Sequence, residues 1–246
     1  MKKTLLSIFL ITVLGCSSND ENKEVIADKK LITEIELDVK NNMSETRNYF
    51  YTEGMLTKIR TIDHNKDIFE DVFNYKNNKI ESITHLKNNL NIGSNSFYYE
   101  NGLITRSESK EDNITFINSY IYDGVGSLKT IQETSGNKVI QQSSFEYKNT
   151  SLSGINTTIK NVNDPKGSLI YKATYESDSE NSPYLNVYTK ELINIWLPFP
   201  VQNVSTQTNS NGDVYTYEYI YENHKPIQVI EKLSGTSISK TTYIYE

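Results

Sequence analysis

One short motif, an aromatic residue followed by any residue and then by tyrosine, recurs along almost the whole chain. Its closing tyrosines at positions 51, 75, 99, 122 and 147 are 23 to 25 residues apart. Such regular self-similarity indicates a repeat architecture in which each period is one supersecondary unit. The seven clear copies are Tyr49–Tyr51, Phe73–Tyr75, Phe97–Tyr99, Tyr120–Tyr122, Phe145–Tyr147, Tyr219–Tyr221 and Tyr243–Tyr245, and a weaker copy is Ala173–Tyr175.

Each period of the repeat predicts a β-hairpin. The first and last residues of the motif lie on the same face of a strand, because successive side chains alternate between faces. Residues that readily adopt a positive φ follow the motif, as a tight hairpin turn requires. Aliphatic residues then restart the chain, with Leu56 and Ile59 after the first turn. The turn residues are Glu53-Gly54, Asn77-Asn78, Asn101-Gly102, Asp123-Gly124 and Asn223-His224.

Hairpins joined in sequence predict an all-β fold, a repetitive antiparallel up-and-down meander of about 14–18 strands. We expect a single β domain over residues 31–246 that forms either a wide curled sheet or a barrel-like structure. Aromatic and aliphatic rows are expected on the inner face, with Thr, Ser, Asn, Lys and Glu on the outer face. We interpret the tyrosine rows as core, with cross-strand aromatic pairs that fix the register, rather than as a ligand platform.

The repeat is interrupted between Tyr175 and Tyr221, which are 46 residues apart. This spacing is close to two periods, so we expect one hairpin to be replaced or decorated. Apolar residues at helical spacing predict one short helix or lid near residues 184–197 that covers an opening of the sheet. The favoured interpretation is a plug that hides the end of the core from water. The alternative is a binding lip, whose candidate ligand-binding residues are Trp196, Phe199, Tyr184 and Tyr188.

The N-terminal segment has the features of a targeting sequence. Lys2 and Lys3 precede an apolar run, Thr4–Leu14, that is too short to span a membrane stably. A glycine and Cys16, the single cysteine of the chain, follow this run. The order of charge, apolar run, small residue and cysteine resembles the lipobox of bacterial lipoprotein precursors. The resemblance implies a lipoprotein signal peptide over residues 1–15 and attachment of thioether-linked lipid and palmitate to Cys16, which makes the membrane a partner.

The residues after this cysteine are expected to form a flexible acidic tether over residues 16–30. Ser17–Glu24 is polar and acidic and has no apolar period. This segment resembles the short acidic export signals of Bacteroidetes surface lipoproteins. The resemblance implies a location at the outer membrane, with the domain facing the cell exterior.

The repeat itself also carries a resemblance to known proteins. The motif, the Asn-Gly turn and the following Leu-x-x-Ile are similar to the tyrosine-aspartate repeats of the Rhs type. Residues 30–246 as a whole resemble a large group of uncharacterised Bacteroidetes lipoproteins with a domain of unknown function and a porin-like β fold. One unit, Tyr122-Asp123-Gly124, has the Tyr-Asp-Gly signature itself. The resemblance implies a fold and an anchor, and it brings no catalytic residues.

Residue patterns that support catalysis or metal binding are missing from the sequence. The three histidines, His64, His85 and His224, fall in or near different connections without metal-ligand spacing. No Gly-x-Ser-x-Gly elbow is present. We therefore predict no metal, no cofactor and no enzymatic activity. The formal net charge of −6 gives no electrostatic footprint for a nucleic-acid partner.

Two functions remain as hypotheses from the sequence. The first is a non-enzymatic, lipid-anchored surface protein that binds a glycan, a peptide or a partner outer-membrane protein. The alternative is a carrier that holds a small apolar ligand inside a curved sheet or barrel. An empty apolar interior would favour the carrier. A membrane-spanning porin is disfavoured, because charges such as Arg106, Glu108 and Lys110 crowd the expected strands.

Overall fold

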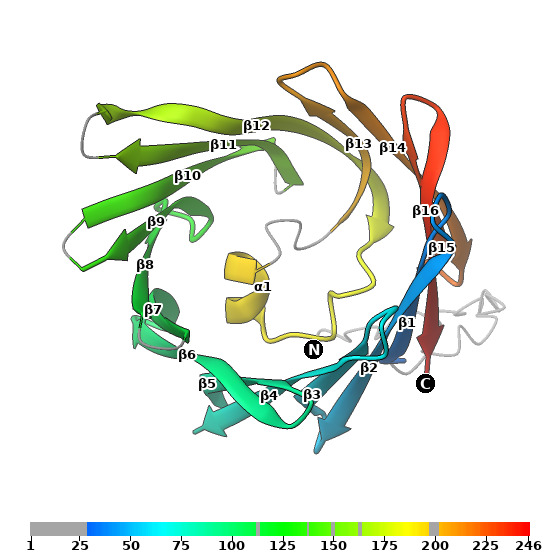
Figure 1. The fold of residues 1–246 in the computed structure, drawn as a ribbon, viewed down its shortest axis with the longest axis horizontal. Coiled ribbons are helices and arrows are strands. Elements are labelled where there is room, and N and C mark those ends of the chain that lie inside the picture. The colour runs from blue at the N-terminus through cyan, green and yellow to red at the C-terminus, as the bar shows by residue number, and fades with distance from the viewer. Residues whose placement is uncertain (1–28, 112–113, 137, 149–150, 162–163, 197–201) are drawn as a thin grey trace, which may run out of the picture.

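The protein folds into one closed antiparallel barrel of sixteen strands with a short helix inside it (Figure 1). The computed structural model describes residues 29–111, 114–136, 138–148, 151–161, 164–196 and 202–246. Each strand pairs with its neighbours in the chain, and β1 closes the barrel by pairing with β16, with Glu34 opposite Tyr243. The predicted all-β meander and its strand number are confirmed, and of the two predicted forms, curled sheet or barrel, the structure has the barrel.

The elements are β1 (Leu31–Asp38), β2 (Met43–Thr52), β3 (Met55–Ile62), β4 (Ile68–Lys76), β5 (Lys79–Lys87), β6 (Leu90–Glu100), β7 (Leu103–Glu111), β8 (Ile114–Tyr122), β9 (Leu128–Ser135), β10 (Lys138–Lys148), β11 (Ser151–Asn161), β12 (Asp164–Asn181), α1 (Lys190–Trp196), β13 (Gln202–Asn209), β14 (Val214–Glu222), β15 (Lys225–Leu233) and β16 (Thr236–Tyr245).

Each of the seven clear copies of the aromatic motif lies at the end of an even-numbered strand, and the weaker copy Ala173–Tyr175 lies within β12. The first aromatic residue points into the barrel and is buried, as Tyr49 and Phe73 show, except that Tyr219 is only partly buried. The middle residue points outwards, and Phe50 and Ile121 are exposed. A bulge at the closing tyrosine shifts the register with the following strand in β2, β4, β6, β8, β10 and β14. Bulges bend strands and so help a sheet to curve into a barrel.

Five of the closing tyrosines form the same kind of hydrogen bond at one end of the barrel. At this end the ladder between an odd strand and the next even strand stops, for example at Lys58↔Val72. The tyrosine hydroxyl donates to the backbone carbonyl that the ladder leaves without a strand partner. The bonds join Tyr51 to Leu31 (2.8 Å), Tyr75 to Leu56 (2.8 Å), Tyr99 to Ile80 (2.9 Å), Tyr122 to Ile104 (2.8 Å) and Tyr245 to Pro226 (2.8 Å).

Most of the expected tight turns form as the sequence indicates. Asn77 and Asn78 both have positive φ, at 52° and 60°, and Asn223 and His224 do so at 49° and 62°. The turn at Asp123-Gly124 is different, because the positive φ falls on Gly126 instead. The Asp123 carboxylate accepts backbone N–H bonds from Val125 (3.0 Å) and Ser127 (2.8 Å). A side-chain-capped loop therefore replaces the predicted two-residue turn.

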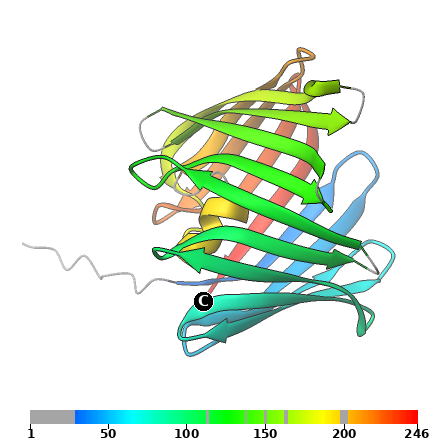
Figure 2. The ribbon, with the colours of Figure 1, turned by 90° about the vertical axis from the view of Figure 1, so that its left-hand side faces the viewer.

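The outer face of the barrel carries charges in the middle of its strands. Glu70 on β4 is covered by Lys58 and Arg60 of β3, whose nitrogens lie 3.1 Å and 2.8 Å from its carboxylate. Lys58 also lies over the outward ring of Phe50, 4.8 Å from its centroid. Hydrogen bonds from Lys58 and Arg60 lower the pKa of Glu70 below its ordinary value. Strands of this wall run obliquely to the barrel axis, as Figure 2 shows.

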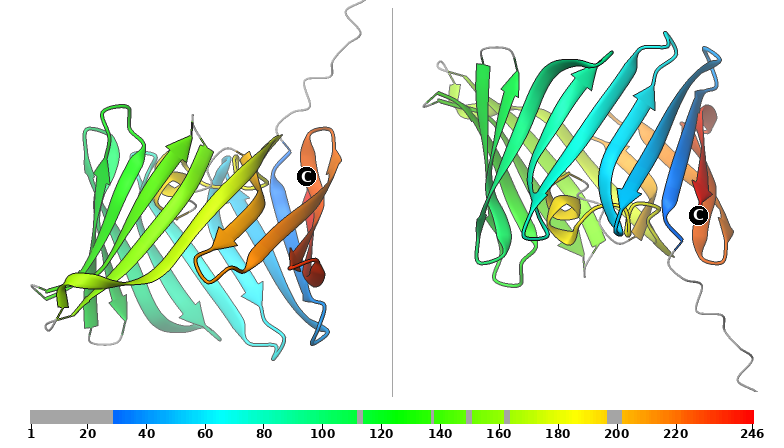
Figure 3. Two further views of the ribbon diagram at one scale, coloured as in Figure 1. Left: turned by 90° about the horizontal axis from the view of Figure 1, so that it is seen from above. Right: turned by 90° about the horizontal axis from the view of Figure 1, so that it is seen from below.

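The interruption of the repeat is an insertion and does not replace a hairpin. The closing tyrosines at 175 and 221 belong to β12 and β14, which are separated by β13 as in the other periods. The additional residues enter the barrel, where α1 lies inside the ring of strands (Figure 1). Figure 3 shows that α1 lies close to the end of the barrel at which β1 begins. We call residues 182–196 the plug.

The plug is less helical than the sequence predicts. The predicted short helix or lid near 184–197 is present, with α1 in its second half and turns at Ser182–Leu185 and Tyr184–Val187 before the seven residues of α1. Both conformations bury an apolar stripe, so spacing alone did not distinguish them. Val187, Leu192, Ile193 and Ile195 are buried. No helix of the described residues has the length and apolar character needed to cross a membrane.

Candidate functional site

A pocket of about 190 Å³ lies between the plug and the barrel wall. Four tyrosine side chains line it: Tyr184 from the plug, Tyr217 and Tyr219 from β14, and Tyr243 from β16. The polar residues Asn203 and Gln207, both on β13, also belong to the lining, together with Gln202 and Ser182. We call this site the tyrosine pocket and define it by the four tyrosines, Asn203 and Gln207.

The pocket lies where two neighbouring strands separate. β13 and β14 pair over a short ladder that ends at Thr206↔Thr216. Beyond this point β14 continues to pair with β15 as far as Glu222, while β13 stays with β12 through Val204↔Ser177. The wall is therefore split towards the plugged end (β13 and β14 in Figures 1 and 3). Side chains of the plug and of both strands line the pocket there.

The aromatic groups of the pocket are fixed by contacts with one another. The Tyr184 ring meets the Tyr243 ring edge-on, with a centroid distance of 6.4 Å and an interplanar angle of 88°. Tyr219 stacks on Tyr221 at 5.7 Å. Ring pairs with these geometries are favourable beyond the area that they bury. The pocket thus has ordered aromatic walls.

The amide groups of the pocket are oriented by neighbouring side chains. Gln207 donates from Nε2 to the hydroxyl of Tyr171 (3.2 Å) and to Oδ1 of Asn209 (2.9 Å). Because both amide hydrogens are engaged, the group left for a ligand is the carbonyl Oε1, an acceptor. Asn203 donates from Nδ2 to the carbonyl of Asn181 (3.1 Å) and to the hydroxyl of Tyr221 (3.0 Å).

Carboxylates accept hydrogen bonds from tyrosines at and beside the pocket. Tyr217 donates to Glu231 Oε1 at 3.4 Å, and Glu231 Oε2 accepts from Ser239 at 2.9 Å. Tyr221 donates to Asp178. Burial, followed by the charge of Glu231, raises the pKa of Tyr217, and burial followed by the charge of Asp178 raises that of Tyr219. Within the described chain, no Lys, Arg or His side chain lines the pocket.

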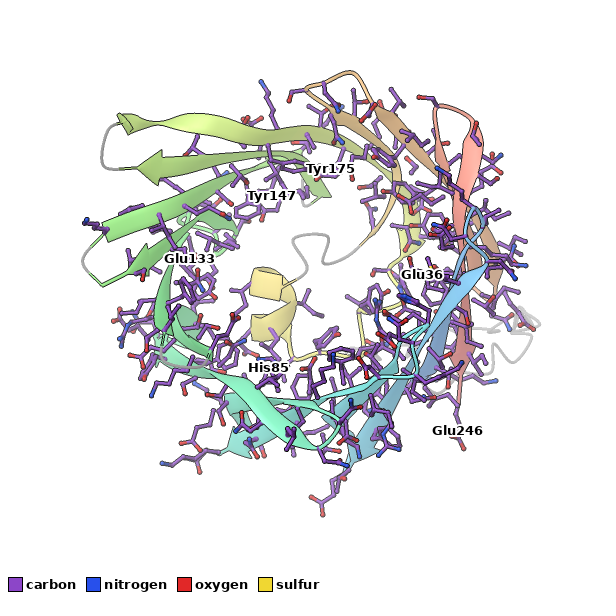
Figure 4. The ribbon with its side chains drawn as sticks, viewed as in Figure 1. Glu36, His85, Glu133, Tyr147, Tyr175 and Glu246 are labelled. Atoms are coloured by element: carbon purple, nitrogen blue, oxygen red, sulfur yellow. The ribbon has the colours of Figure 1, made fainter. Side chains whose placement is uncertain are left out.

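The lumen next to the pocket is also rich in carboxylates. Glu34 is buried and accepts hydrogen bonds from Tyr49 (2.7 Å) and Arg47 (3.0 Å). Arg47 also pairs with Glu45 at 2.5 Å and approaches Glu36 at 3.9 Å. Three carboxylates thus surround the single guanidinium of Arg47. Burial raises the pKa of Glu36. Glu36, His85 and Glu133 all lie on the inner side of the wall in Figure 4.

The two predicted ligand-binding residues whose side chains are described, Tyr184 and Tyr188, lie in different places. Tyr184 lines the tyrosine pocket, whereas Tyr188 packs against Phe73 at 6.4 Å inside the barrel. Trp196 closes α1, and its side chain is not among the described groups. Phe199 and the predicted lipidation site Cys16 lie outside the described residues, as do the predicted signal peptide and most of the tether.

Most residues of the pocket were missed by the sequence interpretation. Tyr219 and Tyr243 belong to the repeat motif and were interpreted as core. The available signal was the alternation of tyrosines at 215, 217, 219 and 221, which puts four hydroxyl-bearing rings on one face of β14. Among the described residues, no group of three or more His, Cys, Asp and Glu side chains is arranged to hold a metal ion.

Two solved structures share this fold at low sequence identity. A porin-like protein from Bacteroides uniformis ATCC 8492 is 12% identical, with a TM-score of 0.61 over 89% of this chain and 96% of that one. A porin-like protein from Bacteroides vulgatus ATCC 8482 is 12% identical, with a TM-score of 0.60 over 89% of this chain and 99% of that one. No protein-family model and no curated protein matches the sequence. The porin-like β fold implied by the resemblance is confirmed.

Proposed function

We propose that this chain is a non-enzymatic binding protein of the bacterial envelope, held at the outer membrane by a lipid on Cys16. It recognises a glycan, a peptide or a partner protein at the cell surface by admitting a small group of that ligand into the tyrosine pocket. The observation that carries the proposal is the pocket itself, where four tyrosines meet the free carbonyl of Gln207. Aromatic walls with a few oriented polar groups are typical of ligand sites.

The charged side chains on the outer face of the barrel support the proposal that the wall faces water and that a lipid anchor holds the protein. Lys58, Arg60 and Glu70 form an outward cluster on neighbouring strands, and Arg106 pairs with Glu108 on β7. A lysine or arginine facing lipid at the bilayer midplane costs about 2–4 kcal/mol. The fold shared with the two porin-like proteins supports a location in the bacterial envelope. The plug lies inside the barrel and narrows the lumen through which a channel would conduct.

The carrier alternative has less support. The tyrosine pocket, at about 190 Å³, is smaller than the roughly 300–1,000 Å³ of sites that enclose a drug-sized ligand. Val187, Leu192 and Ile195 of the plug pack into the core. A small group of a larger ligand fits this space better than a whole lipid.

The test is a binding screen with the full-length protein against glycan and peptide arrays. Tyr219→Leu removes a pocket wall, and Tyr98→Leu removes an exposed outward tyrosine of β6 as a matched control. The proposal expects a ligand that the wild type and Tyr98→Leu retain and that Tyr219→Leu loses. Equal binding by all three proteins to every ligand found would overturn the pocket as the site.

A further inference from the structure

We propose that the tyrosine pocket is selective for an organic cation, a ligand that presents an ammonium or quaternary ammonium group. This inference rests on the proposed function, because it names the chemistry of the group that the pocket admits. Three features of the described residues carry it: the number of aromatic residues that line the pocket, the carboxylates next to these residues and the volume of the pocket.

The aromatic walls come from three separate parts of the chain. Tyr184 is supplied by the plug, Tyr217 and Tyr219 by β14, and Tyr243 by β16, so tyrosines from three parts of the chain line one space. The face of an aromatic ring attracts a cation, and several rings together form the cages that recognise quaternary ammonium groups. A flat neutral ligand ring needs only one aromatic surface to stack on, so it does not require aromatic walls on several sides.

The charged groups next to the pocket tyrosines are carboxylates, and their negative charge attracts a cation. Glu231 accepts the Tyr217 hydroxyl and Asp178 accepts that of Tyr221, which stacks on Tyr219. A phenol that donates to a carboxylate has a more electron-rich ring, and this strengthens its attraction for a cation. The pocket lining itself holds neither a carboxylate nor a positive side chain among the described residues, so these acids act through the tyrosines that they contact.

Arg47 is a competing cation on the lumen side of the pocket. Its charge bears on Tyr184, but it is engaged by Glu34 at 3.0 Å and by Glu45 at 2.5 Å. The local balance therefore stays negative, and anionic ligands such as phosphates and acidic sugars are repelled. The Gln207 carbonyl gives an ammonium N–H a neutral acceptor on the same lining.

The size of the pocket limits the ligand to a compact group. A volume of about 190 Å³ admits a trimethylammonium or a short alkylammonium head and excludes an acyl chain. Such a head occurs both on small solutes and on the headgroups of zwitterionic lipids. The shared chemistry is the onium group, and the experiment must separate its two sources.

The experiment is a calorimetric titration of the full-length protein with choline and with 3,3-dimethyl-1-butanol, its neutral carbon isostere. We expect choline to bind about tenfold or more tightly than the isostere, because only the charge differs. Glu231→Gln is expected to weaken choline severalfold and to leave the isostere unchanged. The control Glu218→Gln, on the outward face of β14 and paired with Lys232, should bind choline like the wild type. Equal affinity for choline and the isostere would overturn the inference.

A vesicle arm separates the two sources of the group. Cosedimentation with phosphatidylcholine vesicles beyond that with phosphatidylglycerol vesicles, competed by free choline, assigns the cation to a lipid headgroup. Choline binding without such a vesicle preference assigns it to a solute. If neither choline nor vesicles bind while an array ligand is still lost in Tyr219→Leu, the cation inference fails and the proposed function stands. If nothing depends on Tyr219, both fail.

Discussion

At the closing position of the repeat motif, phenylalanine would lack the hydroxyl group that tyrosine supplies. The ring fills space in the core, but the hydroxyl satisfies a backbone carbonyl at the point where the ladder ends. A buried carbonyl without a partner is costly, so the five periods that have this bond gain a hydrogen bond to the preceding strand. The lysines that lie over some of these rings, such as Lys79 at 5.1 Å from Tyr99, add a further contact.

Removal of one such hydroxyl is expected to destabilise the barrel. Tyr99→Phe leaves the Ile80 carbonyl without its 2.9 Å bond and should lower the free energy of unfolding by about 1–2 kcal/mol. Tyr98→Phe, one residue earlier and facing outwards, should change it by less than about 0.5 kcal/mol. Urea unfolding followed by circular dichroism measures both. Equal effects of the two substitutions would contradict the role given to the hydroxyl.

The outward carboxylate Glu70 gives the stability of the barrel a dependence on pH. Hydrogen bonds from Lys58 and then Arg60 lower the pKa of Glu70 below its ordinary value of 4.5. The stabilisation is therefore fully present above pH 4.5 and is lost as the pH falls through the lowered folded value. We expect Glu70→Gln to destabilise the protein at pH 7 and to have a smaller effect at pH 3. Thermal unfolding at the two pH values tests this, and Glu81→Gln, an exposed partner of Lys76, is the control.

The individual residues of the site were harder to predict than those of the core. The repeat motif identified the buried rings, because burial follows directly from the alternation of side chains along a strand. Tyr219 and Tyr243 carry the same motif but line a pocket, since the plug leaves space beside them. Their role depends on the path of a distant segment, which no local pattern specifies.

The plug depends on the barrel for its structure. A helix of seven residues is far below the roughly 12–15 residues at which isolated helices become marginally stable in water. Burial of side chains such as Leu192, which is 0% exposed, must therefore hold α1 in place. The strands have a different source of stability, because each of them is hydrogen-bonded on both sides.

We expect the plug to open locally when its apolar anchor is lost. Leu192→Asp places a carboxylate in an apolar site, so the plug should leave its position while the barrel stays folded. Hydrogen exchange measured by mass spectrometry should then rise in residues 182–196 and remain low in β4 to β8. Glu191→Gln, a partly exposed neighbour on the same helix, should leave exchange unchanged. Loss of protection throughout the barrel would show that plug and wall form one cooperative unit.

The elements themselves were predicted unevenly. Hairpins followed from the motif and from Asn-rich turns, since a positive φ at Asn77 and Asn78 is a local property. The turn after Asp123 was missed because a side-chain cap replaces the backbone turn. The spacing of 46 residues was interpreted as two periods, but the structure divides it into one hairpin and an insertion.

Closure is a property of the whole molecule that the sequence left open. It depends on pairing between β1 and β16, the two ends of the described chain, with Leu31 opposite Tyr245. Repeated hairpins favour neighbour pairing at every step, but each period is compatible with an open sheet as well as with a barrel. The sum of twist and bulges over sixteen strands decides between them.

The outward charges lead to a prediction for the anchored molecule as a whole. If the wall faces water and the lipid on Cys16 holds the protein, exchange of residues 1–16 for a secretory leader with an ordinary cleavage site should release a folded barrel. We expect the native chain in the detergent phase of a Triton X-114 partition and the exchanged chain in the aqueous phase. An outward Lys58–Arg60–Glu70 cluster would be costly in lipid, so the barrel alone should have no affinity for the bilayer. Retention of the exchanged chain in washed membranes would instead place the wall in lipid and overturn the anchored arrangement.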